Sequence, residues 1–319
     1  MNQEIRPRPS GSTAGNEKTL VRLAADIGGT FTDIVLEVGD ERLTRKILTT
    51  AKYPELGVMN GTGLALDEAG LTYADIDIFV HGTTLATNAV LERSGANTAL
   101  IATEGFRDVI EIGTEGRFDQ YDLQIEKQVP LVPRSLRLTV RERIDSQGNV
   151  LVELDEAALA DHARRLEKEK IESVAICFIH AYANGDHERR ARDILAAALP
   201  HVPISISSEV CPEIREYERT STTVANAYVR PQMADYLARM KSALSRVKFN
   251  GVIYLVTSNG GLTSLETARR FPVRLIESGP AGGAIFAADI AARLDERSVL
   301  SFDMGGTTAK ICLIDDGTP

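Results

Sequence analysis

A short turn sequence that occurs twice constrains the fold of this chain more than any other feature. The pattern Asp-x-Gly-Gly-Thr stands at residues 26–30 and again at residues 303–307. Each copy lies between two apolar segments typical of β-strands, so each is predicted to be the turn of a β-hairpin. The repetition indicates an internal repeat, and we interpret it as two hairpins that face one another across a cleft.

The residue types in this pattern suit the binding of phosphate. Glycines at a tight turn permit a positive φ and leave backbone N–H groups bare, which creates a concave anion site. Threonine hydroxyls add donors at its rim. An aspartate beside them can hold Mg²⁺ through its water molecules or orient a nucleophile toward a bound phosphate. A single such turn is typical of an ordinary hairpin, but two matched copies favour a pair of phosphate-binding hairpins.

Composition limits the class of protein. The chain has 319 residues, of which 43% are hydrophobic and 25% are charged, as in globular proteins with room for two domains. The net charge of −9 argues against a nucleic-acid surface, and no apolar run has the length of a membrane span. We therefore expect neither nucleic acid nor membrane as a partner.

The N-terminus and the cysteines indicate the compartment. Residues 1–20 are polar, contain proline and glycine, and lack the apolar core of a signal peptide, so they are predicted to be a disordered leader. Cys177, Cys211 and Cys312 are far apart and lack metal-binding spacing. This favours a reduced, cytoplasmic location, with the three thiols as small buried groups.

The order of apolar patterns predicts an α/β layer with a mixed sheet. Three strands come first and can pair as a meander, and helices then alternate with strands. Further on we predict a long loop, a hairpin, a late strand and a glycine-rich loop that opens an alanine-rich helix ending near Leu294. These four predictions fall on residues 114–137, 138–153, 273–276 and 277–283, respectively.

Polar residues follow one short apolar strand, predicted at residues 77–80. His81 stands at its end, with Thr83, Thr84 and Asn88 nearby. Ligands of open α/β sheets bind at the carboxyl ends of strands, so these side chains are candidates for a binding site. A hydrogen-bonded histidine beside a helix cap is the structural alternative, and the residues leave both interpretations open.

Two further segments have a structural and a functional interpretation. Glycines 279, 282 and 283 precede a predicted helix, whose N-terminal N–H groups and dipole attract anions; a plain strand-to-helix turn is the alternative. The charged run at residues 215–219 is predicted to be a solvated face, with a cleft wall as the alternative. No Gly-x-Ser-x-Gly, His-Glu-x-x-His or Walker A pattern is present, which disfavours serine hydrolases, zincins and P-loop ATPases.

Several motifs in order make the chain resemble the hydantoinase A/5-oxoprolinase family, which belongs to the superfamily of actin, sugar kinases and heat-shock ATPases. The resemblance extends from about Val21 to the C-terminus. It implies a ribonuclease H-like, actin-like ATPase lobe with a mixed sheet, a further α/β segment and a truncated second lobe. It also implies an N-terminal-type domain at residues 21–200 and the start of a hydantoinase A-type domain at residues 201–319. The matching motifs are at residues 26–33, 81–88, 103–108, 213–219, 258–261, 277–283 and 302–307.

The resemblance also implies an activity, namely ATP-dependent ring opening of a cyclic amide or imide such as 5-oxoproline or a hydantoin. In that chemistry ATP phosphorylates the amide carbonyl oxygen, which makes the carbonyl carbon open to attack by water. Phosphoryl transfer of this kind depends on positioned phosphates, Mg²⁺ and carboxylates. A small cyclic amide substrate and a B-type hydantoinase subunit are the implied partners.

The implied roles fall on particular residues. Asp26, Asp303 and His81 would be catalytic, and the two aspartates would also hold Mg²⁺. Thr83, Thr84 and Asn88 would face the substrate. The phosphates of ATP would contact Gly28, Gly29, Thr30, Thr32, Gly279, Gly282, Gly283, Gly305, Gly306, Thr307 and Thr308.

The chain departs from the family pattern at two points. Ala309 and Lys310 stand where the family often has Thr-Asp, which removes a carboxylate and adds a cation. Family members also continue well beyond the second hairpin, so we expect a truncated chain that is inactive alone. The residues leave three other functions open: a subunit of an ATP-dependent ketone carboxylase, a small-molecule kinase and a non-catalytic assembly partner.

Overall fold

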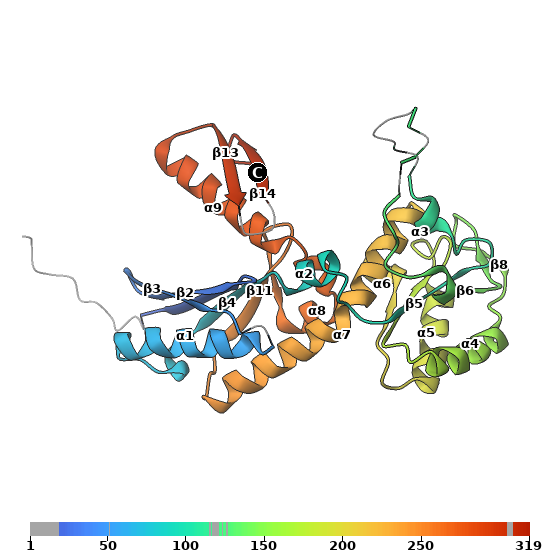
Figure 1. The fold of residues 1–319 in the computed structure, drawn as a ribbon, viewed down its shortest axis with the longest axis horizontal. Coiled ribbons are helices and arrows are strands. Elements are labelled where there is room, and N and C mark those ends of the chain that lie inside the picture. Colours follow the sequence, from blue (N-terminus) through green and yellow to red (C-terminus); the bar gives the residue numbers. More distant parts are fainter. Residues whose placement is uncertain are drawn as a thin grey trace, which may run out of the picture.

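A computed structural model describes residues 19–50, 52–114, 116, 121–122, 124–125, 127–304 and 309–319. In this part of the chain a six-stranded mixed sheet and a four-stranded parallel sheet lie at opposite ends of one long helix, α7 (Figure 1). A smaller arm, made of α9, β13 and β14, projects from the six-stranded sheet. The predicted leader lies outside the described residues, apart from its last two positions.

The first sheet has the strand order β12-β11-β4-β1-β2-β3. The strands β1, β2 and β3 form the predicted antiparallel meander. On the other side of β1, β4 pairs parallel with β1, and β11 pairs parallel with β4. Alternate residues of β1 are buried toward α1 (Pro54–Ala69), which ends at Gly70 in a left-handed conformation, φ 68°, as a C-terminal glycine permits. The strands are β1 (Val21–Ile27), β2 (Phe31–Val38), β3 (Glu41–Leu48), β4 (Ile78–Thr83), β11 (Val252–Val256) and β12 (Leu262–Ser264).

The second sheet has the order β10-β9-β5-β6, and all of its strands are parallel. Apolar residues on one face pack against α4 (Glu156–Lys168) and α5 (Asp186–Ala198). Asp155 accepts a hydrogen bond from Ala158 N and so caps α4. The strands are β5 (Thr98–Thr103), β6 (Arg137–Val140), β9 (Ser173–Cys177) and β10 (Ile204–Ile206).

The long helix α7 (Glu216–Arg246) contributes to the cores of both sheets. Val224 and Ala227, in its first half, pack with apolar residues of the second sheet. Met233 and Leu237, in its second half, belong to the core beneath the first sheet. Because one continuous helix supplies both cores, the two sheets are held in a fixed relation by buried apolar surface.

The arm contains α9 (Ser278–Leu294), β13 (Ser298–Met304) and β14 (Ala309–Asp315). The two strands pair antiparallel, which confirms both strands of the second predicted hairpin. Its turn residues, Gly305, Gly306, Thr307 and Thr308, lie outside the described residues. The remaining elements are the α-helices α2 (Leu85–Leu91), α3 (Val109–Ile112), α6 (Ser207–Val210) and α8 (Leu265–Arg270), the strands β7 (Arg143–Ile144) and β8 (Val150–Val152), and the 3₁₀-helices η1 (Tyr73–Asp75), η2 (Arg134–Leu136) and η3 (Pro272–Leu275).

Several local predictions were wrong in whole or in part. The strand predicted at residues 273–276 is wrong: residues 273–275 belong to the 3₁₀-helix η3, because Pro272 is fixed at a helical φ and starts a helical turn. The glycine segment at 279–283 is helical, since α9 already begins at Ser278. The predicted hairpin at residues 138–153 is present but shorter than expected, because β7 pairs antiparallel with β8 while β6, which precedes them, pairs with β5. Of the three cysteines, only Cys177 is buried.

The predicted sequence domains do not coincide with the two sheets. Residues 21–200 contain both the meander and most of the second sheet, whereas β10 and α7 follow residue 200 and pack on β9. None of the helices in the described part of the chain has the length and hydrophobicity of a bilayer-crossing segment.

Candidate active site

The candidate site lies at the edge of the first sheet where the parallel strands β1, β4 and β11 end. Three loops leave this edge: the hairpin turn at residues 28–30, Thr84, and the turn at residues 257–261. The N-terminus of α9 is anchored beside them, since Ser278 Oγ donates to Thr83 O at 3.5 Å and Glu277 N donates to Thr87 Oγ1 at 3.0 Å. Ligands of open α/β sheets bind at such an edge.

The hairpin turn is closed by its own backbone and supported by β3. Gly28 N donates to Phe31 O at 2.9 Å, and Thr49, next to β3, holds the turn through its hydroxyl, which donates to Gly28 O at 2.9 Å. Gly29 and Thr30 are exposed at the tip, where a ligand can reach them. The glycine turn is therefore a firmly held structure with an accessible tip.

Asp26 stands on the open face of the sheet, opposite the face that packs on α1. It pairs across β2 with Asp33 and across β4 with Gly82. The absence of a side chain at Gly82 makes room for the carboxylate, because a Cβ there would lie 2.8 Å from Asp26 Oδ1. The sheet thus brings the Asp26 carboxylate close to the backbone of β4.

The charge of Asp26 is incompletely balanced. Partial removal from water raises the pKa of Asp26, repulsion from Asp33 and Asp303 raises it further, and Lys46 lowers it. Although the side chain keeps contact with solvent, the neighbouring protein atoms reduce its hydration. Lys46 is engaged by Asp33, with 2.6 Å between Nζ and Oδ1. Because the charge of Asp303 on β13 raises the pKa of Asp26, the two predicted aspartates lie within electrostatic range of each other.

These carboxylates suit a magnesium ion that is held partly by water. Among the described residues no group of three histidine, cysteine, aspartate or glutamate side chains could bind a metal directly. Mg²⁺ retains several water molecules in its sites and is often held by one or two carboxylates together with substrate phosphates. The unbalanced negative charge of Asp26, with Asp303 nearby, fits such a cation.

Two predicted site residues lie inside the fold instead. Thr32 is fully buried on the face toward α1, and its hydroxyl lies 2.9 Å from that of Thr49. His81 is 1% exposed, and β4 continues past it to Thr83. Thr32 thus supports the turn from within, and the predicted end of the strand at residue 80 was wrong.

The surroundings of His81 give it a structural role. Its Nδ1 lies 3.0 Å from Ala25 O, and its Nε2 lies 2.6 Å from Tyr236 Oη on α7. Burial lowers the pKa of His81 to about 4, so the ring is neutral at physiological pH. Both ring nitrogens therefore link β4 to its neighbours, and a catalytic role for His81 stays a prediction.

Of the three residues predicted to face the substrate, one is buried in the fold and two lie beside the hairpin turn. Thr83 is buried, and its hydroxyl accepts a hydrogen bond from Leu85 N at 3.3 Å. Thr84 and Asn88 are partly exposed and joined side chain to side chain at 3.3 Å. The Asn88 amide lies close to Gly29, 3.8 Å from where a Cβ of that glycine would stand. Thr84 and Asn88 thus border the hairpin turn.

The first two turns of α9 leave open space beside the site. Within the described part of the chain, a Cβ on Gly279, Gly282 or Gly283 would meet no other atom within 4 Å. A cavity of about 350 Å³ adjoins this part of the helix and is lined by Pro280 and Ala281 of α9 and by Asn259 and Gly260; the three glycines do not line it. Glycines that face open space allow a ligand to approach the backbone closely.

The cation that departs from the family pattern has a partner. Lys310 Nζ lies 2.5 Å from Glu277 Oε2, and Glu277 precedes α9 with φ 65°. This ion pair links β14 to the N-terminus of α9. Lys310 therefore neutralises a carboxylate beside the cavity.

The run at residues 215–219 is only partly the solvated face that was predicted. Arg219 is 1% exposed and donates to Glu213 O at 2.8 Å and to Phe178 O at 3.1 Å. Its guanidinium also lies over the ring of Tyr182. The sequence analysis missed the burial of Arg219 and the places of Lys46 and Gly82 at the site. The pairing of Asp33 with Asp26 could have been found by counting residues through the hairpin turn.

Comparisons with known proteins assign the family. The model of the hydantoinase/oxoprolinase N-terminal region matches residues 22–199, and that of hydantoinase/oxoprolinase matches residues 219–319. The chain belongs to the hydantoinase/oxoprolinase family. Family members of this kind depend on ATP, and the mixed-sheet fold is that of actin-like ATPases.

The relatives that match this family member are covered by it only in part. An uncharacterized protein of Methanocaldococcus jannaschii is 43% identical over 93% of this chain and 44% of its own length. The caprolactamase subunit alpha of Pseudomonas jessenii is 36% identical over 94% of this chain and 44% of its own length. The nucleotide-free structure of acetone carboxylase matches with a TM-score of 0.86 and 28% identity, over 94% of this chain and 44% of that one. The chain thus spans less than half the length of these relatives.

Proposed function

We propose that this chain supplies the phosphate-binding edge of an enzyme that uses ATP to open a cyclic amide or imide, such as 5-oxoproline or a hydantoin. The observation that carries the proposal is that Asp26 stands on the open face of the sheet beside an accessible glycine turn, where the charge of Asp303 raises its pKa. The family membership and the 36% identity to a caprolactamase subunit support a lactam as the substrate class.

The described residues can divide the work of phosphoryl transfer. Gly29 and Thr30 at the hairpin tip, with the N-terminal turns of α9, would hold the phosphates of ATP, because bare N–H groups and the helix dipole attract anions. Asp26 and Asp303 would hold Mg²⁺, which balances phosphate charge when bound. Gly305, Gly306, Thr307 and Thr308 of the second hairpin would complete the phosphate site.

The substrate would bind next to this edge. Thr84 and Asn88 border the hairpin turn and present a hydroxyl and an amide, which can hydrogen-bond a cyclic amide. Phosphorylation of the amide oxygen makes the carbonyl carbon a better electrophile for water. A B-type hydantoinase subunit is the proposed partner, and the relative from Pseudomonas jessenii is itself named a subunit.

The phosphate site is tested by titration calorimetry of the full chain with a non-hydrolysable ATP analogue and Mg²⁺. We expect saturable binding that depends on Mg²⁺ and is lost in Asp26→Ala. Asp40→Ala is the matched control, because Asp40 is an exposed aspartate at the turn of the same meander, between β2 and β3. Equal binding by both variants, or no binding by the wild-type chain, would contradict the assignment.

A second candidate function is favoured by one observation, the structural match to acetone carboxylase with a TM-score of 0.86. In that case the chain would serve an ATP-dependent ketone carboxylase. The two candidates differ in what stimulates ATP hydrolysis by the chain assembled with its partner subunit. Stimulation by a lactam without bicarbonate supports the ring-opening enzyme, whereas stimulation that requires a ketone and bicarbonate supports the carboxylase.

A further inference from the structure

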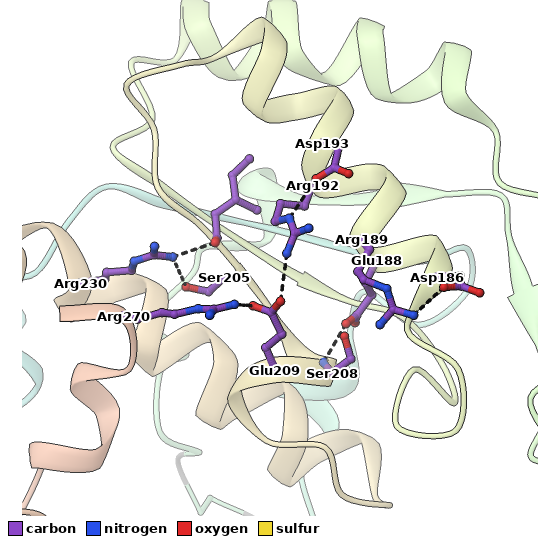
Figure 2. A network of polar contacts seen from close by, with 11 residues as sticks. Asp186, Glu188, Arg189, Arg192, Asp193, Ser205, Ser208, Glu209, Arg230 and Arg270 are labelled. Carbon is purple, nitrogen blue, oxygen red and sulfur yellow. Dashed lines mark hydrogen bonds and ion pairs between the residues drawn. The ribbon is translucent and has the colours of Figure 1, made fainter. Parts of the chain in front are cut away.

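A small cationic cavity lies between the two sheets, away from the candidate active site. Its volume is about 130 Å³. Arg192 of α5 and Ser205 of β10 line it from the side of the second sheet, Arg270 of α8 lines it from the side of the first, and Arg230 enters from α7 (Figure 2). Elements of both sheets therefore meet around it.

The cavity holds more positive than negative charge. Three arginines line it, together with one carboxylate, that of Glu209 on α6. Arg192 Nη1 lies 2.9 Å from Glu209 Oε1, and Arg270 Nη2 lies 2.5 Å from Glu209 Oε2, so each oxygen of this carboxylate already has a cationic partner (Figure 2). Arg192 also contacts Asp193, which is mostly exposed and does not line the cavity.

Arg230 has no carboxylate partner among the described residues. Its Nη1 donates to Ile204 O at 2.7 Å and lies 3.4 Å from Ser205 Oγ. Burial lowers the pKa of Arg230, the charge of Arg270 lowers it further, and Glu209 raises it. A half-buried guanidinium beside like charge is unfavourable unless an anion balances it.

A second carboxylate of α5, that of Glu188, is engaged elsewhere. Glu188 of α5 is fully buried and accepts hydrogen bonds from Phe178 N, Ser207 Oγ and Ser208 N. Burial raises the pKa of Glu188, which disfavours its charged form. Glu188 therefore holds the start of α6 in place and does not balance Arg230.

We propose that this cavity is a binding site for a small oxyanion, with inorganic phosphate as the best-matched size, which joins α5 and β10 to α8. Arginine guanidinium groups present several donors in a plane, a geometry that suits phosphate and carboxylate oxygens. The Ser205 hydroxyl, which is buried and also accepts a hydrogen bond from Asn226 Nδ2 at 3.0 Å, adds a polar group to the wall.

The test measures the thermal midpoint and the apparent Kd of the full chain for inorganic phosphate, at constant ionic strength set with chloride. We expect a saturable rise in Tm with phosphate and at least a tenfold weaker apparent Kd in Arg230→Gln. Sulfate should act as phosphate does if the site takes a tetrahedral dianion, whereas acetate acting as strongly would identify a carboxylate as the ligand.

Two variants keep the result unambiguous. Arg189→Gln is the matched control, because Arg189 is also on α5 but pairs with Asp186 outside the cavity (Figure 2). Arg192→Gln serves as a second site variant if Arg230→Gln fails to fold. Repeating the titration in Asp26→Ala separates this cavity from the proposed ATP site, since the phosphate effect should persist there. The proposal would be overturned if Arg230→Gln, or Arg192→Gln in its place, bound phosphate as tightly as the control Arg189→Gln.

Discussion

Asp26 carries a charge that the folded chain stabilises poorly. Removal from water, Asp33 and Asp303 all raise the pKa of its carboxyl group, and only Lys46 acts in the opposite direction. Residues arranged for function often cost stability in this way, because a bound cation and not the protein completes the charge balance. A cation bound at this position would remove the repulsion that the free chain bears.

Replacing this carboxylate should therefore stabilise the free chain. A pKa raised in the folded state means that the charged form weakens folding, and this loss is complete above the folded-state pKa and absent below the unfolded value near 3.8. We expect Asp26→Asn to have a higher Tm than the wild type at pH 7, with the difference shrinking as the pH falls toward 4. Thermal denaturation across this range measures it, with Asp40→Asn as the control. A lower Tm of Asp26→Asn at pH 7 would contradict this account.

At the scale of an element, helix α9 contains glycines at positions where alanine would make the helix more stable. A glycine inside a helix costs about 0.5–1 kcal/mol relative to alanine. Gly282 and Gly283 lie within the helix, and a Cβ on either would meet no neighbouring atom of the described residues within 4 Å. Packing in the described structure does not require them, so their open space is available to a ligand.

The substitution Gly282→Ala separates stability from binding. We expect it to raise the free energy of unfolding by about 0.5–1 kcal/mol, because alanine favours the helix, and to weaken binding of the ATP analogue by approaching its phosphates. Chemical denaturation and calorimetry measure the two effects. Gly70→Ala is an informative comparison, since that glycine follows α1 with φ 68° and should only lose stability. Unchanged nucleotide affinity in Gly282→Ala would argue against a ligand beside α9.

Local patterns predicted most elements, and distant contacts decided what the sequence could not show. The meander and the strands around the second hairpin follow from nearby residues, and the structure confirms them. The face to which a side chain points depends on packing. His81 is held by Tyr236, 155 positions away, and no pattern around His81 announces that partner. Thr32 is likewise buried because α1 covers its face of the sheet.

At the scale of the molecule, the arm differs from the two sheets in how little of it is buried. Phe286, Leu300 and Leu313 are among its exposed apolar side chains, each at least 60% accessible, and few arm residues are buried. Elements with few buried apolar contacts open locally at a lower free energy than a packed core. We therefore expect the arm to open locally at a lower free energy than the two packed sheets.

Hydrogen exchange followed by mass spectrometry measures this difference. We expect amides in peptides from residues 284–304 to exchange at least tenfold faster than those of β1 and β4. Peptides from the buried half of α7 near Leu237 provide the internal reference. Protection of the arm equal to that of β1 would show that its strands gain stability from contacts other than those described.

The pairing of β10 with β9 has a consequence for how such chains can recombine. The match to the first family model ends at residue 199, the match to the second begins at residue 219, and β10 lies between them. A gene fusion that exchanged the first segment between relatives would set β9 of one parent against β10 and α7 of the other. Residues from different parents would then meet inside the core of the second sheet and pack poorly. The two segments, which look like separate domains in the sequence, should therefore be exchanged only together.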